Sequence, residues 1–161
     1  MLRGAVGNDN LNGGDGSDIL SSSAVSAIFG DDDPYDGGDF SSDILYGGDG
    51  NDTYIIAESR DVINETVNGG IDPVIAHRSY TLGNNLENLT LAEPQYSSGN
   101  FRITGNGLNN RIVGNSKRNV LQGQAGNDSL NGGAGDDTLS FGVIDRRLDG
   151  SSGTDTLTVE Y

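Results

Sequence analysis

A nine-residue period runs through much of the sequence and limits the folds open to it. Two units stand back to back near the start, Gly4–Asn12 and Gly13–Ser21, and two more follow an interruption, Gly38–Tyr46 and Gly47–Ile55. From Gly105 to Thr158 the spacing continues through six units. Such regular repetition indicates that each unit folds against its neighbours in a stacked array rather than into an ordinary globular core.

Each position of the unit has a physical role. Glycine recurs at positions one, two and four, where backbone angles forbidden to other residues let carbonyl groups converge. Aspartate recurs at position six, beside those carbonyls. Position eight is a large apolar residue that stacking would bring into one ladder, namely Leu11, Leu20, Leu45, Tyr54, Ile112, Leu121, Leu130, Leu139, Leu148 or Leu157. A disordered glycine-rich linker would have no reason to keep this spacing, so the period favours a folded array.

The charge of the chain points to a bound cation. The 161 residues carry a formal net charge of -15, with 19 Asp and 17 Asn, and contain no cysteine. Compact packing of so many carboxylates requires a neutralising cation, and neither disulfides nor thiolate metal sites are available. The acidity argues against nucleic acid as a partner. No apolar run approaches the length of about 20 residues that a membrane span requires.

The units GGDGSDILS, GGDGNDTYI and GGAGDDTLS match the nonapeptide G-G-x-G-x-D-x-U-x at every defined position, where U is a large apolar residue. The sequence thereby resembles the RTX (repeats-in-toxin) family of hemolysin-type calcium-binding repeats. The resemblance implies an all-β fold, a right-handed parallel β-roll or β-solenoid in which two units make one turn. It also implies that six-residue loops of neighbouring turns hold Ca²⁺ between them, with oxygen ligands of the kind that calcium prefers.

The resemblance assigns the calcium ligands residue by residue. The loops are expected to supply backbone carbonyls, and the position-six side chains are expected to supply carboxylate or amide oxygens. The glycines are Gly4, Gly7, Gly13, Gly14, Gly16, Gly47, Gly48, Gly50, Gly126, Gly132, Gly133, Gly135 and Gly153. The position-six residues are Asp9, Asp18, Asp43, Asp52, Asn110, Asn119, Asp128, Asp137 and Asp155. At the variable third position, Asp15 and Asp49 are expected to be solvated.

The implied stacking predicts which position-six residues face one another. With the insertion looped out and a step of 18 residues elsewhere, the pairs are Asp9/Asp43, Asp18/Asp52, Asn110/Asp128, Asn119/Asp137, Asp128/Arg146 and Asp137/Asp155. The guanidinium of Arg146 would repel a cation, so no calcium is expected between its turn and that of Asp128.

The period divides the chain into three segments. Residues 1–55 are expected to form a first calcium-binding block with an insertion at 22–37, and residues 105–161 a second one. Residues 56–104 do not fit the nonapeptide and are expected to form a metal-free stretch of the same solenoid. Short strands are predicted there at Asp61–Glu65, Val74–Ala76, Ser79–Leu82, Glu87–Leu91 and Phe101–Thr104.

The resemblance implies a non-catalytic module of a secreted bacterial protein. Such a module would pass unfolded through the type I secretion machinery and fold outside the cell on binding calcium. The alternative is a surface that binds polysaccharide, adheres, or assembles with another copy of the chain, which a glycan array and the solution size in calcium would reveal. An enzyme is not expected, because the single histidine, His77, lacks catalytic partners in the sequence.

Overall fold

The computed structural model describes residues 1–4, 7–22, 42–57, 60–93, 100–142, 144–145 and 147–159, and within these ranges every regular element is a β-strand. The largest sheet contains β1 (Leu2–Arg3), β3 (Ile19–Ser21), β5 (Thr53–Ile56), β7 (Pro73–Ala76), β9 (Asn88–Leu91), β11 (Arg111–Val113), β13 (Ser129–Asn131) and β15 (Arg147–Asp149). A second sheet contains β8 (Tyr80–Thr81), β10 (Phe101–Thr104), β12 (Asn119–Gln122), β14 (Thr138–Phe141) and β16 (Thr156–Val159). A third contains β2 (Asn10–Asp15), β4 (Ile44–Asp49) and β6 (Val62–Asn64). None of the described elements is a helix that could cross a membrane.

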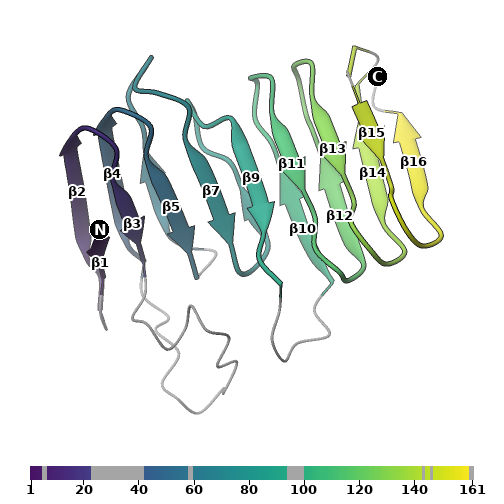
Figure 1. Ribbon diagram of the computed structural model, residues 1–161, viewed down its shortest axis with the longest axis horizontal. Coiled ribbons are helices and arrows are strands. Elements are labelled where there is room, and N and C mark those ends of the chain that lie inside the picture. Colours follow the sequence, from purple (N-terminus) through teal and green to yellow (C-terminus); the bar gives the residue numbers. More distant parts are fainter. Residues whose placement is uncertain are drawn as a thin grey trace.

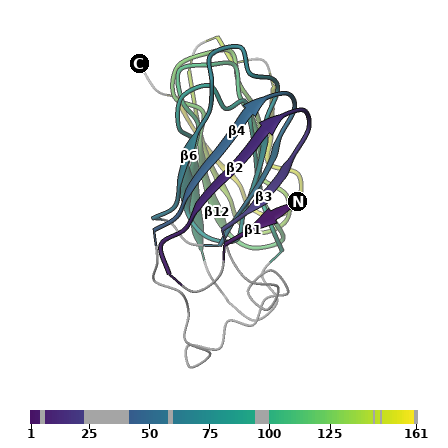
Figure 2. The same ribbon diagram turned by 90° about the vertical axis from the view of Figure 1, so that its left-hand side faces the viewer.

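The strands wind as a parallel β-roll, which confirms the predicted fold class. Odd-numbered strands form one face and even-numbered strands the other, and every strand pairs in parallel with the strand one turn away (Figure 1). Seen from the N-terminal end, the two faces form two layers (Figure 2). The even-numbered face is divided, because β6 and β8 are not hydrogen-bonded to each other.

The register confirms that two nonapeptides make one turn. Leu139 lies beside Leu121 on one side and Leu157 on the other, at steps of 18 residues. Leu11 pairs with Leu45 across the insertion, so these two turns stack as predicted. Residues 23–37 of the insertion lie outside the described residues.

The core is a ladder of position-eight side chains between the two faces. Eight of the ten are buried, and Leu20, Leu45, Tyr54, Ile112, Leu121, Leu130 and Leu139 are completely so. Leu148 is only partly buried, and the prediction for Leu157 is wrong, since its side chain is 56% exposed. Its strand, β16, pairs with β14 alone among the described strands, so its outer edge has no neighbour among them.

The central segment continues the same core without the nonapeptide. The five short strands predicted there correspond to β6, β7, β8, β9 and β10. Their inward residues join the position-eight ladder in one cluster that includes Ile63, Val74, Leu89 and Ile103. His77 follows β7 and is half-buried, and its backbone N–H donates to the carbonyl of Ile56.

Candidate metal centre

Acidic side chains form a ladder along the turns that lead into the odd-numbered strands. The backbone N–H of Asp18 donates to Oδ1 of Asp52 at 2.7 Å, and that of Asp52 donates to Oδ1 of Asp72 at 2.8 Å. The backbone N–H of Asp72 in turn donates to Oε2 of Glu87 at 3.1 Å. Farther along, Asn110 donates in the same way to Asp128 at 2.8 Å. In each of these pairs, a side-chain oxygen of the later residue accepts from the backbone N–H of the residue one turn earlier.

A second ladder follows the turns that lead into the even-numbered strands. The backbone N–H of Asp9 donates to Asp43 at 2.9 Å, and that of Asp43 donates to Asp61 at 3.1 Å. Beyond the division between β6 and β8, the same bonds join Asn119 to Asp137 at 2.8 Å and Asp137 to Asp155 at 3.0 Å. Five predicted pairs therefore lie in contact, namely Asp9/Asp43, Asp18/Asp52, Asn110/Asp128, Asn119/Asp137 and Asp137/Asp155.

The predicted glycines lie in the loops beside these side chains. Those at position one touch the carboxylates, and a Cβ at Gly4 would lie 3.0 Å from Oδ2 of Asp43. All of the others adopt positive φ, which only glycine adopts readily, and they are Gly7, Gly14, Gly16, Gly48, Gly50, Gly126, Gly133, Gly135 and Gly153. At Gly13, a Cβ would lie 2.7 Å from the carbonyl oxygen of Gly47 in the next turn. Loops of neighbouring turns thus bring carbonyl oxygens and carboxylates together.

Several ladder carboxylates have one buried oxygen that no protein group satisfies. Oδ2 of Asp52, Asp72, Asp128 and Asp137 is buried and has no hydrogen-bond partner, although Oδ1 of each accepts a backbone N–H. Burying a charged oxygen unpaired is costly, and a coordinated cation removes that cost. An all-oxygen donor set fits Ca²⁺.

A comparison with known families agrees with this chemistry. The profile of the RTX calcium-binding nonapeptide repeat (4 copies) matches residues 1–24, 35–63 and 104–139, which is more than half of the chain. The chain belongs to this RTX repeat family. Neither the curated proteins nor the solved structures contain a further match. Calcium is therefore the metal that its repeats bind.

Burial raises the pKa of three aspartates in the ladders. The pKa of Asp72 rises to about 6, chiefly by desolvation, with further contributions from the charges of Glu65 and Glu87. Desolvation likewise raises the pKa of Asp128 to about 6 and raises that of Asp137. In each case the hydrogen bond from a backbone N–H acts in the opposite direction.

These raised values predict how the calcium-free fold responds to pH. Asp72 and Asp128 have pKa values of about 6 in the fold and 3.8 ordinarily, so the folded state binds more protons over that interval. Stability without calcium is therefore expected to rise as the pH falls from 7 towards 4. Far-UV circular dichroism in a chelator should show more sheet at pH 4.5 than at pH 7. A loss of sheet on acidification would contradict this, and with calcium present the order should reverse because protons compete for the ligands.

The sequence prediction missed several ladder members in the central segment. Asp61, Asp72 and Glu87 each stand immediately before a strand, and each lies two residues before a buried apolar residue. That acid-x-apolar spacing is the spacing of positions six and eight in the nonapeptide. The signal was present, but without the full set of glycines that accompanies it elsewhere.

The predicted pair Asp128/Arg146 has a different outcome. Arg146 lies outside the described residues, and the backbone N–H of Asp128 donates instead to Oδ1 of Asp145 at 3.0 Å. Asp145 also accepts from the backbone N–H of Gly142 at 2.7 Å. A carboxylate therefore holds this step of the ladder, and the absence of calcium between these turns stays a prediction.

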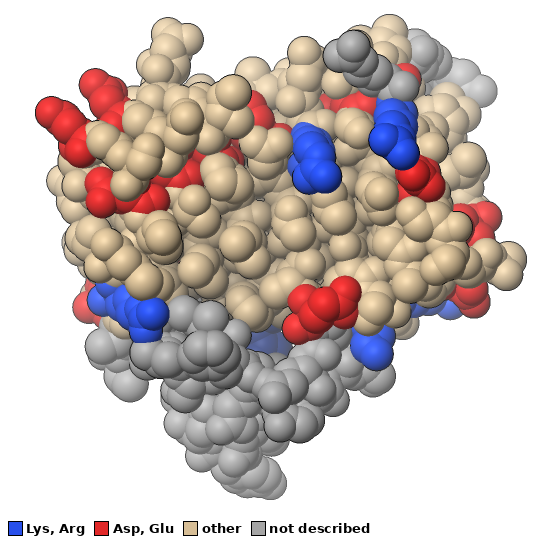
Figure 3. Space-filling view, in the orientation of Figure 1, with Lys and Arg blue, Asp and Glu red and all other residues tan. Residues whose placement is uncertain are grey.

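Other acidic side chains serve other purposes. Asp15 and Asp49 are exposed, as predicted, and Figure 3 shows acidic side chains gathered over the turns at the N-terminal end of the roll.

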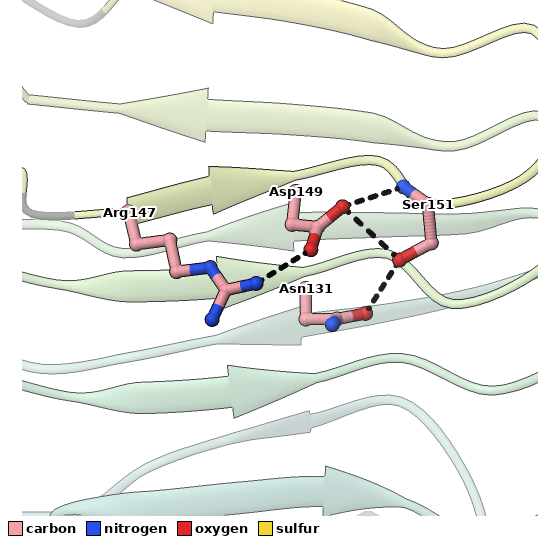
Figure 4. A network of polar contacts seen from close by, with 4 residues as sticks. All are labelled: Asn131, Arg147, Asp149 and Ser151. Atoms are coloured by element: carbon pink, nitrogen blue, oxygen red, sulfur yellow. Dashed lines mark hydrogen bonds and ion pairs between the residues drawn. The ribbon is translucent and has the colours of Figure 1, made fainter.

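Asp149 accepts from Arg147 at 2.9 Å and from the backbone N–H of Ser151 at 3.0 Å (Figure 4). The hydrogen bonds from Ser151, followed by that from Arg147, lower the pKa of Asp149. This network shapes the turn after β15.

A cleft of about 380 Å³ lies where β6 and β8 separate. Its walls are Asp61, Val62, Ile63, Ser79, Tyr80, Thr81, Gly83 and Arg102. Burial, then the charge of Asp61, raises the pKa of Tyr80 to about 12, so its hydroxyl stays protonated. Carboxylate, hydroxyl and guanidinium groups thus lie beside apolar side chains in the walls of one cleft.

Proposed function

We propose that this chain is a non-catalytic module of a secreted bacterial protein that folds when it binds calcium. The observation that carries the proposal is the set of buried carboxylate oxygens without a hydrogen-bond partner in the two ladders, at Asp52, Asp72, Asp128 and Asp137. Without calcium these groups are desolvated and repel one another, within a chain of net charge -15. Calcium binding reverses that penalty, so the binding energy becomes folding energy.

Membership of the RTX family supports the cellular setting of this switch. RTX repeat proteins are typically secreted, and extracellular calcium sites bind at roughly 10⁻⁴–10⁻³ M. A chain with such sites would stay unfolded where calcium is scarce. It would therefore be competent for the type I secretion machinery and would fold outside the cell.

Calcium titration of the isolated chain tests the proposal. Far-UV circular dichroism in a chelator is expected to show little sheet at pH 7, and sheet should appear with a midpoint of roughly 10⁻⁴–10⁻³ M calcium. Magnesium at equal concentration is the control for simple charge screening, because its demand for near-octahedral geometry suits these loops poorly. Full sheet without calcium, or equal folding in magnesium, would contradict the proposal.

Binding of polysaccharide is a second candidate, which the cleft between β6 and β8 favours. Asp61, Tyr80 and Arg102 place carboxylate, hydroxyl and guanidinium groups in its walls, which are the kinds of group that hydrogen-bond to a sugar. A glycan array probed in calcium would separate this candidate from a module that binds metal alone.

A further inference from the structure

Three carboxylates from two successive turns converge beyond the nonapeptides. Asp52 precedes β5, Asp72 precedes β7, and Glu65 follows β6. One oxygen of each lies within 4.8 Å of the other two. Glu65 and Asp72 fall outside the residues that match the RTX repeat, so no nonapeptide accounts for them.

Two of these converging carboxylates are completely buried, and each has one oxygen that no protein group satisfies. Asp52 and Asp72 are each 0% exposed, and Oδ2 of each has no hydrogen-bond partner. Their Oδ1 atoms already accept backbone N–H groups from Asp18 and Asp52. The remaining oxygens therefore require a ligand that supplies positive charge.

Two glycines bring backbone and carboxylate oxygens together around this point. A Cβ at Gly47 would overlap Oδ2 of Asp52 and the hydroxyl of Tyr54, and would lie 2.6 Å from Oε2 of Glu65. A Cβ at Gly69 would lie 2.8 Å from Oε1 of Glu65 and 2.8 Å from the carbonyl oxygen of Gly48. Any other residue at either position would fill the space where these oxygens converge.

Glu65 is held toward the cluster rather than free in solvent. The hydroxyl of Tyr54 donates to its Oε2, and the backbone N–H of Thr66 donates to its Oε1 at 2.7 Å. Burial, followed by the bond to Glu65, raises the pKa of Tyr54 far above its ordinary value. Tyr54 therefore stays a donor, and its hydrogen bond keeps Glu65 oriented toward the cluster.

We propose that Asp52, Glu65 and Asp72 bind a calcium ion that joins the Gly47–Asp52 turn to the segment beyond the repeats. Three ionised carboxylates outweigh the charge of one Ca²⁺, so the ion is fully neutralised by the protein. Calcium accepts such an irregular set of oxygens, whereas magnesium does not. The inference rests on the proposed calcium-dependent folding and extends metal binding into residues 56–104, where the sequence predicts none.

Calorimetric calcium titration of the full chain tests this site through Glu65→Gln, which keeps the size of the side chain and an acceptor for Tyr54. The matched control is Glu93→Gln, because the carboxylate of Glu93 instead accepts from the hydroxyl of Ser116 at 2.6 Å. We expect Glu65→Gln to bind one calcium ion fewer, or to bind one ion about tenfold more weakly. Glu93→Gln should match the wild type.

The outcomes separate this inference from the proposed function. Wild type and Glu65→Gln that fold with calcium and bind it with equal number and affinity would overturn the site alone. A wild-type chain that binds no calcium would overturn both.

A second measurement covers the case in which Glu65→Gln does not fold. Tb³⁺ replaces calcium, and its luminescence is excited through tyrosine in the wild type and in Tyr54→Phe, which retains all three carboxylates. Loss of most of the tyrosine-sensitised emission in Tyr54→Phe would support the site, and unchanged emission would overturn it.

Discussion

Replacing Gly50 with alanine is expected to cost about 3 kcal/mol or more of stability in saturating calcium, which is enough to unfold a marginal domain. Gly50 has φ +129°, and a Cβ there would overlap the carbonyl group of Gly16 in the turn below. Its backbone N–H donates to the carbonyl of Gly69 in the turn above at 2.7 Å. The loop therefore contacts the turns on both sides, and it cannot shift to relieve the overlap with Gly16 without disturbing the hydrogen bond to Gly69.

Alanine substitutions at two further glycines separate the two causes of this loss, which are backbone strain and steric overlap. Gly16 has φ +105° but no heavy atom within 4 Å of an added Cβ, so Gly16→Ala carries backbone strain without overlap and should cost about 1–3 kcal/mol. Gly107 has open space and no positive φ, so Gly107→Ala should change stability by less than about 0.5 kcal/mol. Urea denaturation in calcium measures all three. Equal losses for Gly50→Ala and Gly107→Ala would show that the loops do not stack as described.

The period predicted the stacking, because a fixed spacing leaves little choice of register. In the later run, Leu121, Leu139 and Leu157 had to align once two nonapeptides make a turn. The same reasoning predicted that Leu11 pairs with Leu45 across the insertion, as it does in the structure. Where the period holds, the spacing in the sequence is therefore enough to predict which residues align between turns.

The period could not predict the ladder in the central segment. Asp72 follows Asp52 by 20 residues and Glu87 follows Asp72 by 15, so a rule based on a step of 18 residues misses both. The turns between these residues vary in length, but the strands that follow the residues, β5, β7 and β9, are still successive neighbours in one sheet, and this aligns the acidic side chains. The local signal that these residues share is the two-residue spacing from acid to buried apolar residue.

The division of the even-numbered face was also beyond the sequence. β8 is two residues long and pairs with β10, while β6 pairs with β4, and no bond joins the two. Which neighbours a short strand selects depends on turn geometry that periodicity does not specify. The later run contains a similar case. The period pairs Asp128 with Arg146, but the side chain that accepts from Asp128 is that of Asp145.

Leu139→Ala should destabilise the calcium-bound chain by about 2–5 kcal/mol, whereas Leu157→Ala should cost less than about 1 kcal/mol. Both residues occupy position eight of a nonapeptide, and they are direct neighbours in the sheet. Leu139 is 0% exposed and Leu157 is 56% exposed, so only the first truncation leaves a cavity. The repeat pattern alone predicts equal losses.

The free energy of unfolding in urea, with calcium saturating, decides between the two expectations. Calcium stoichiometry serves as the internal control, because neither side chain carries a ligand and both variants should bind as many ions as the wild type. Equal destabilisation would show that β16 is covered in solution and that Leu157 belongs to the core. The expected inequality would instead establish that β16 is an open edge, where the repeat is present in sequence but its core position has nothing to pack against.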